Sequence, residues 1–267
     1  SLRGFETAGG GGRRVRFYVQ TASDTGPYRF LLPIRLSAAG EPDTTVYRFI
    51  TLPFQQVSLE TGGREVSAVE LDPGFDLFRK VYPGEMPLTL AAFFGAADGM
   101  LIVPSRGAHA EAYRRVAEGL KTEGQEVIDD LDAQRDPRLK DRPQWLLGGP
   151  GENRLWESLE PDPSRLRFTF PEGGRDLAKL PDGVILNDER LPGRSITVTM
   201  VLPRSTADGK IIPTVYTVAL PGAEPVDGTR KLPHYGKYSY LAFEGDRNVR
   251  KGTYPPSGDS PMTWRAR

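Results

Sequence analysis

"MLIVPSRGAHAEAYRRVAEGLKTEG", residues 100–124, is the stretch that decides the fold of the larger part of the chain. Its first residues are short and wholly apolar, as in a strand that is covered on both faces. Apolar residues then recur every four positions on one face of a predicted helix, at Ala108, Ala112, Val116 and Leu120. Gly124 stands where a helix C-cap belongs. A strand followed by such a helix predicts a β-α step.

The same step is repeated further along the chain. "QEVID" (125–129) and "QWLLGG" (144–149) are again short apolar runs, so residues 99–160 predict two β-α steps on a parallel sheet. After residue 165 the pattern returns to strands, in the runs "LRFTF", "GVILN", "SITVTMVLP", "IIPTVYTVAL" and "YSYLAF". We therefore predict a three-layer α/β domain over residues 85–267, with a mixed sheet and a strand-rich C-terminal half.

The first 84 residues predict β structure throughout. Five short runs are separated by Gly, Pro and Asp: "RVRFYVQ" (14–20), "YRFLLPIRL" (28–36), "TTVYRFITL" (44–52), "FQQVSLE" (54–60) and "VSAVELD" (66–72). Val15, Phe17 and Val19 alternate with Arg14, Arg16 and Tyr18, which is typical of a strand with one buried face. Strands without an intervening helix predict a β-sandwich domain over residues 1–84. "GGGG" (9–12) predicts a flexible connection.

Composition narrows the classes of partner. The 267 residues carry 35 basic and 35 acidic side chains, which predicts no nucleic-acid partner. No apolar run approaches the ~18 residues of a membrane span. The absence of cysteine excludes disulfides, thiolate nucleophiles and cysteine metal sites. It leaves the compartment open, including the cell envelope and secretion. The chain begins with Ser1 instead of Met, so we expect it to be part of a longer polypeptide.

Neither of the two histidines fits a catalytic motif. "HAEAY" (109–113) lacks both the adjacent Glu and the second His of a zinc-binding His-Glu-x-x-His, so we predict that His109 is a helix-surface residue. No Gly-x-Ser-x-Gly is present to supply a nucleophile for His234. We predict that His234, Tyr235 and Lys237 anchor a late central strand, "YGKYSYLAF" (235–243), through hydrogen bonds.

A glycine-rich stretch, "LLGGPGENRL" (146–155), is the candidate ligand-binding loop. Glycines between an apolar strand and a helix put main-chain N–H groups and a helix N-terminus at one point, as in many anion sites. The candidate residues are Gly148, Gly149, Gly151, Glu152 and Asn153. Their spacing matches neither Gly-x-Gly-x-x-Gly nor a Walker loop, which favours a plain β-α turn. The acidic stretch 126–136 lacks the glycine and the spacing of a calcium loop.

The order of the first strands resembles a known family. "VRFYVQ", "PYRFLLPIRL", "TTVYRFITLPFQQVSLE" and "VELDPGFDLFRKV" are similar to the β-sandwich that follows the catalytic domain in the aminopeptidase N family of zinc metallopeptidases. The positions that carry the resemblance are Gln20, the strand from Tyr28 to Leu36, the strands at 44–60, and Val69 to Val81. The remainder resembles the C-terminal extension of some bacterial members, and departs from the long helical C-terminal domain of the better-known ones.

The resemblance implies a non-catalytic role for this chain. The family's chemistry rests on His-Glu-x-x-His with a downstream Glu, and on Gly-x-Met-Glu-Asn, and none of these motifs is present. The expectation is a C-terminal region that supports a peptidase domain of the same polypeptide and shapes substrate access or recruits partners. Zinc is expected in that domain and no cofactor in this chain. The alternative is a small-molecule or anion-binding domain that uses the Gly148–Asn153 loop.

Overall fold

The computed structural model describes residues 1–8, 14–22, 29–170, 181–191, 195–220, 222–224, 228–256 and 260–266. Two compact units divide the chain: Ser1–Met86 with Pro256–Arg267 form the first, and Pro87–Pro255 form the second. Each unit has a hydrophobic core of its own. The predicted flexible connection at residues 9–12 and the predicted strand start at Tyr28 lie outside the described residues.

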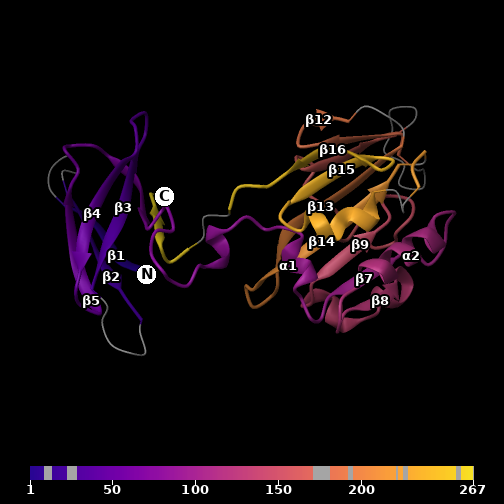
Figure 1. Cartoon of the computed structure of the whole chain (residues 1–267), viewed down its shortest axis with the longest axis horizontal. Coiled ribbons are helices and arrows are strands. Elements are labelled where there is room, and N and C mark those ends of the chain that lie inside the picture. Colours follow the sequence, from indigo (N-terminus) through magenta and orange to yellow (C-terminus); the bar gives the residue numbers. More distant parts are fainter. Residues whose placement is uncertain are drawn as a thin grey trace. The chain divides into compact units, whose positions relative to one another are not determined.

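The first unit is a β-sandwich, as the sequence predicts (Figure 1). One sheet has the order β1-β2-β5 and the other the order β17-β6-β3-β4, with antiparallel neighbours throughout. The strands are β1 (Leu2–Ala8), β2 (Arg14–Gln20), β3 (Phe30–Ala38), β4 (Thr44–Ile50), β5 (Phe54–Glu60), β6 (Val66–Leu71) and β17 (Thr263–Arg265). Val15, Phe17 and Val19 are buried in the core, which confirms the alternation in β2.

The C-terminal strand belongs to the sandwich, and this differs from the predicted domain range of 85–267. Strand β17 pairs with β6, and Trp264 stacks on Phe5 of β1 with ring centroids 3.5 Å apart. Met262 enters the same core. The predicted boundary at residue 84 lies close to the observed division after Met86. A three-residue strand is too short to show a periodic pattern, so the sequence gives no signal for this return.

A buried ion-pair network lies in the segment that follows β6, the last sandwich strand before the second unit. Arg79 Nε donates to Asp72 Oδ2 at 2.7 Å, and both terminal guanidinium nitrogens of Arg79 bond to the carboxylate of Glu85, at 2.9 and 3.0 Å. The Asp72 side chain is fully buried. Its second oxygen accepts from the main-chain N–H groups of Asp76 and Leu77. These bonds fix the turn that follows β6.

The same network sets the protonation of Glu85. Burial by itself would raise the pKa of the Glu85 carboxyl group. Hydrogen bonds from the Arg79 side chain and from the main-chain N–H of Tyr82 act in the opposite direction and outweigh burial. The pKa of Glu85 therefore lies below its ordinary value, and the ionised form is stabilised in the folded protein.

The second unit is built on a seven-stranded mixed sheet of order β16-β15-β13-β14-β9-β7-β8. From β14 to β8 neighbouring strands run parallel, whereas β13, β15 and β16 are antiparallel to their neighbours. The strands are β7 (Met100–Val103), β8 (Glu126–Asp129), β9 (Gln144–Leu147), β13 (Ile196–Ser205), β14 (Ile211–Ala219), β15 (Tyr240–Glu244) and β16 (Arg247–Gly252). This confirms the predicted mixed sheet.

Layers cover both faces of the sheet (Figure 1). On one face lie α1 (Ala91–Phe94), α2 (Ala110–Leu120) and the 3-10 helix η4 (Thr229–Tyr235). On the other lie α3 (Asp130–Ala133), the segment around Trp156 and a small sheet of β10 (Leu166–Thr169), β11 (Gly183–Leu186) and β12 (Glu189–Arg190). Short 3-10 helices are η1 (Pro83–Glu85) and η2 (Pro137–Lys140). The predicted three-layer arrangement is present.

The two β-α steps differ in their helices. Helix α2 follows β7 as predicted and buries Val116 and Leu120 against the sheet, but it begins at Ala110, after an open loop. Only the short α3 and η2 connect β8 to β9. Pro137 and Pro143 interrupt this segment, and proline cannot occupy a helix interior without loss of a hydrogen bond.

Candidate functional site

The glycine-rich loop lies at the carboxyl edge of the parallel strands. Strands β7, β8 and β9 are parallel neighbours, so the loops that follow them meet at one edge of the sheet. The Gly148–Asn153 loop follows β9, and the residues that precede α2 follow β7. This is the place where open α/β sheets usually bind ligands.

Glu152 occupies the position at which an anion would be expected. Its Oε2 accepts hydrogen bonds from the Gly149 N–H at 3.2 Å and from the Tyr113 hydroxyl at 3.1 Å. Its Oε1 lies 2.9 Å from His109 Nδ1. The loop's own carboxylate thus uses the N–H group and the side-chain donors that an external anion would need. This arrangement favours a structural loop over the anion-binding alternative. The helix that the sequence predicts after the glycines is absent from the described chain between β9 and β10, because turns connect these strands.

Tyr113 connects this carboxylate to the central sheet. The side chain is fully buried on α2, and its oxygen also accepts from the Ala219 N–H at the end of β14, at 3.0 Å. Burial, followed by the neighbouring negative charge of Glu152, raises the pKa of Tyr113 well above its ordinary value. The tyrosine is therefore a neutral hydrogen-bond donor to Glu152 across the whole physiological range.

Two further side chains tie the loops at this edge together. Asn153 is buried, and its Nδ2 donates to the carbonyl oxygens of Leu147, at 2.8 Å, and Ile102, at 3.3 Å, which are the last residue of β9 and the last but one of β7, at their carboxyl ends. The buried carboxylate of Asp130, the first residue of α3, accepts from the N–H groups of Ser105 and Arg154. Each loop is thus fixed by a side chain from a neighbouring one.

The loop glycines are required by close packing. A Cβ atom at Gly149 would lie 2.5 Å from Val218 Cγ1, and one at Gly148 would lie 2.8 Å from Pro104 Cγ. Gly148 and Gly151 also have φ angles of 87° and 81°, which side chains disfavour. Glycine at these positions is explained by the approach of the loop to the sheet, without a ligand.

His109 differs from its predicted role as a helix-surface residue. It is the residue before α2, and its side chain is mostly buried against Tyr113 and Glu152. The spacing of His109 and Tyr113, four residues apart at the start of a helix, places both on one face. Their shared partner lies 39 residues beyond Tyr113, so no local pattern points to it.

The predicted strand anchors lie before the strand. His234 and Tyr235 end the 3-10 helix η4, Lys237 follows in a turn, and β15 begins only at Tyr240. His234 and Lys237 are exposed, and neither side chain has a hydrogen bond to the described part of the chain. Tyr235 packs edge-on against Phe243. Contacts of this kind replace the predicted hydrogen bonds, because the proline at 233 and the glycine at 236 keep the segment out of the sheet.

Ser239 is the anchor that sequence reasoning missed. The residue is fully buried, and its hydroxyl donates to the Leu88 carbonyl oxygen at 2.5 Å and accepts from the Tyr254 N–H. Its main chain bonds to Val201 and Gly252 on the two sides. A serine inside an aromatic-rich run gives no sign of such bonds in the sequence.

The acidic stretch 126–136 is used for structure. The Asp129 side chain caps α3 by accepting from two N–H groups, and Glu126 pairs with Arg142. Hydrogen bonds from the side chain and then the N–H of Arg138 lower the pKa of Asp136 to about 2. In the part of the chain that the structure describes, no group of three or more His, Asp or Glu residues could hold a metal ion.

An exposed apolar surface lies on the outer face of the sandwich. Leu31 of β3 is directly opposite Phe49 of β4, and Tyr47 is two residues away on the same face. Their exposed fractions are 49%, 60% and 55%. Leu32 and Ile34 of the same strand point into the core and are buried. We call Leu31, Tyr47 and Phe49 the β3–β4 patch.

Comparisons of the whole chain with protein-family models and with curated proteins found no match. The resemblance to the aminopeptidase N family therefore stays a hypothesis drawn from the order of the strands. Among the described residues, no helix is long and apolar enough to span a membrane.

Proposed function

We propose that this chain is a non-catalytic interaction region whose sandwich packs on another folded protein domain through the β3–β4 patch. The observation that carries the proposal is the exposure of three large apolar side chains at adjacent positions of one sheet face. Contiguous apolar surface of this kind, as opposed to single exposed residues, marks protein interaction sites. Aromatic residues are also the side chains most enriched among those that dominate binding energy.

The position of the patch suits a flat protein surface. The side chains stand on two hydrogen-bonded strands, so the patch is held rigidly and loses little freedom on binding. Strand β4 is an edge strand, and the exposed Arg48 lies beside the two aromatic residues. Charge on an edge strand opposes uncontrolled pairing with further strands. Docking through the face of the sheet is thus favoured over pairing along its edge.

The first partner to test is a zinc aminopeptidase domain of the same polypeptide, because of the resemblance of residues 14–81. The reading frame upstream of Ser1 in the native gene is translated and searched for His-Glu-x-x-His, and a domain that carries this motif is expressed. We expect it to bind the full chain as a separate protein. The isolated chain, supplied with zinc, should release no amino acid from aminoacyl-p-nitroanilide substrates. Turnover by the purified chain would overturn the non-catalytic assignment.

The patch itself is tested with the double variant Tyr47→Thr and Phe49→Thr. Threonine suits a strand, and the replaced side chains are more than half exposed, so the fold should persist. We expect at least tenfold weaker binding to the partner domain, since two aromatic anchors of about 1 kcal/mol or more each are lost. Ile211→Thr is the control, because Ile211 is similarly exposed but lies on β14. Equal loss in both variants would contradict the proposal, as would self-association of the chain through this patch.

A further inference from the structure

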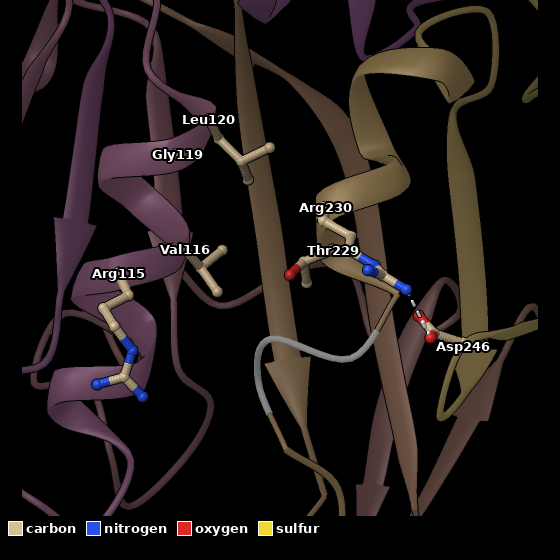
Figure 2. Close-up of a pocket in the computed structure, with 7 residues that line it drawn as sticks. All are labelled: Arg115, Val116, Gly119, Leu120, Thr229, Arg230 and Asp246. Carbon is tan, nitrogen blue, oxygen red and sulfur yellow. Dashed lines mark hydrogen bonds and ion pairs between the residues drawn. The ribbon is translucent and has the colours of Figure 1, made fainter.

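A groove lies in the second unit between helix α2 and the 3-10 helix η4 (Figure 2). Its volume is about 570 Å³, within the range of pockets that hold small molecules. The lining residues are Arg115, Val116, Gly119, Leu120, Thr229, Arg230 and Asp246. It involves none of the residues of the glycine-rich loop or of the β3–β4 patch.

On the α2 side the groove is lined by two apolar side chains and by one glycine. Figure 2 shows Val116 and Leu120 on the side of α2 that faces η4, and both are almost fully buried, so they form the floor of the groove. Gly119 lies between them on the helix, and a Cβ atom there would meet no other atom within 4 Å. Glycine is among the poorest helix formers, so neither the helix nor its packing explains this residue. What the missing side chain does preserve is the width of the groove.

The rim of the groove carries an excess of positive charge. Arg115 stands on the α2 side, and its nearest carboxylate, Glu111, is 3.8 Å away with both side chains well exposed. On the other side Arg230 pairs with Asp246 at 2.8 Å. Two guanidinium groups and one carboxylate therefore line the groove. Because Arg230 is already paired with Asp246, Arg115 is the lining cation that a ligand with one negative charge would complement.

We propose that this groove binds a small amphipathic carboxylate, with its apolar part against Val116 and Leu120 and its carboxylate near Arg115. Guanidinium groups are well suited to carboxylates because they present several donors in one plane. The assignment goes beyond the proposed interaction role and does not depend on it. It concerns a different unit of the chain and a different class of ligand.

Octanoate is the probe and 1-octanol its uncharged counterpart. Titration of each into the ¹⁵N-labelled full chain should shift the amide signals of Gly119 and Thr229. We expect octanoate to bind about fivefold more tightly than 1-octanol at low salt, the gain of one exposed charge interaction near 1 kcal/mol. The difference should shrink as salt is added, because the charges on the rim are accessible to ions.

Two variants separate a specific groove from general surface binding. Gly119→Leu should fill the groove and weaken octanoate binding at least tenfold, while leucine keeps the helix. Arg115→Ala should weaken octanoate about two- to fivefold and leave 1-octanol unchanged. Its matched control is Arg114→Ala, one residue earlier on α2 and outside the lining. Circular dichroism of each variant reports whether the fold is kept.

Three results would overturn the proposal. The first is equal affinity for octanoate and 1-octanol, and the second is the absence of amide shifts around the groove at millimolar octanoate. The third is undiminished binding by a folded Gly119→Leu variant. If that variant does not fold, Arg115→Glu takes its place, and tight octanoate binding by Arg115→Glu would refute the role of the charge.

Discussion

Removal of the Arg79 guanidinium group should destabilise the sandwich strongly. In Arg79→Met the carboxylates of Asp72 and Glu85 would stay buried without their cation, with side chains 0% and 8% exposed. Breaking a buried ion pair from one side costs about 3–5 kcal/mol. The carboxylates keep main-chain hydrogen bonds from Asp76, Leu77 and Tyr82. We therefore expect the lower end, about 3 kcal/mol.

Thermal and urea unfolding of the full chain measure this effect. For a unit of this size, each kcal/mol changes the melting temperature by about 4–8 °C, so the transition of the sandwich should fall by about 12–24 °C. The control is Arg14→Met, because the Arg14–Glu60 pair lies on the surface of the same unit. Exposed pairs contribute about 0–1 kcal/mol. A similar decrease in melting temperature in Arg79→Met and Arg14→Met would show that burial of the network does not add to the stability of the sandwich.

The effect should also depend on pH. In the wild type the pKa of Glu85 is lowered, so its stabilising contribution is present above the pKa of an unfolded glutamate, about 4.3, and is lost as the pH falls through the lower folded value. Without Arg79, burial raises the pKa of Glu85, and acid then relieves the penalty of burying its charge. The difference between Arg79→Met and wild type should thus shrink between pH 7 and pH 4. A constant difference below about 1 kcal/mol would refute the reasoning.

Three other perturbations test the second unit. Gly149→Ala should lower the free energy of unfolding, measured by thermal unfolding, by about 1–3 kcal/mol, because the added methyl group clashes with β14. The control Gly119→Ala should leave the free energy of unfolding unchanged or raise it. Equal changes in both variants would contradict this packing argument. Tyr113→Phe removes the hydroxyl group that is bonded to the Glu152 carboxylate, and it should lower the free energy of unfolding in urea by about 1–3 kcal/mol. The surface control Tyr47→Phe should leave this free energy almost unchanged. ATP and glucose 6-phosphate should leave the melting temperature unchanged; stabilisation near the ~2.7 kcal/mol expected at 100 times Kd would restore the anion-binding alternative for the Gly148–Asn153 loop.

Strand positions were the most predictable part of the fold. The bounds of β2 and β5 coincide with the predicted runs at 14–20 and 54–60. Alternation of apolar residues reports directly on which face of a strand is buried, because successive side chains point to opposite faces. The parallel strands β7 and β9 were equally clear, since both of their faces are covered.

The candidate site was predictable only in its position. A glycine-rich turn after a parallel strand had to lie at the carboxyl edge of the sheet, and it does. That Glu152 fills this turn could not be foreseen, because its side-chain partners, His109 and Tyr113, lie at the start of α2. The sequence alone favoured a plain turn and left a ligand-binding loop open as the alternative.

The sequence by itself determined much of the local order of this protein: most of its longer strands, the position of helix α2, and a sandwich that precedes an α/β unit. It did not predict β1, β12 or β17. Tertiary structure alone decided that β17 returns to the sandwich, that Ser239 joins three segments, and that α2 and η4 leave a groove between them. The physical reason is the range of the interactions. Periodicity records the burial of a residue relative to its immediate neighbours, whereas contacts between distant segments depend on how whole layers pack and leave no local pattern.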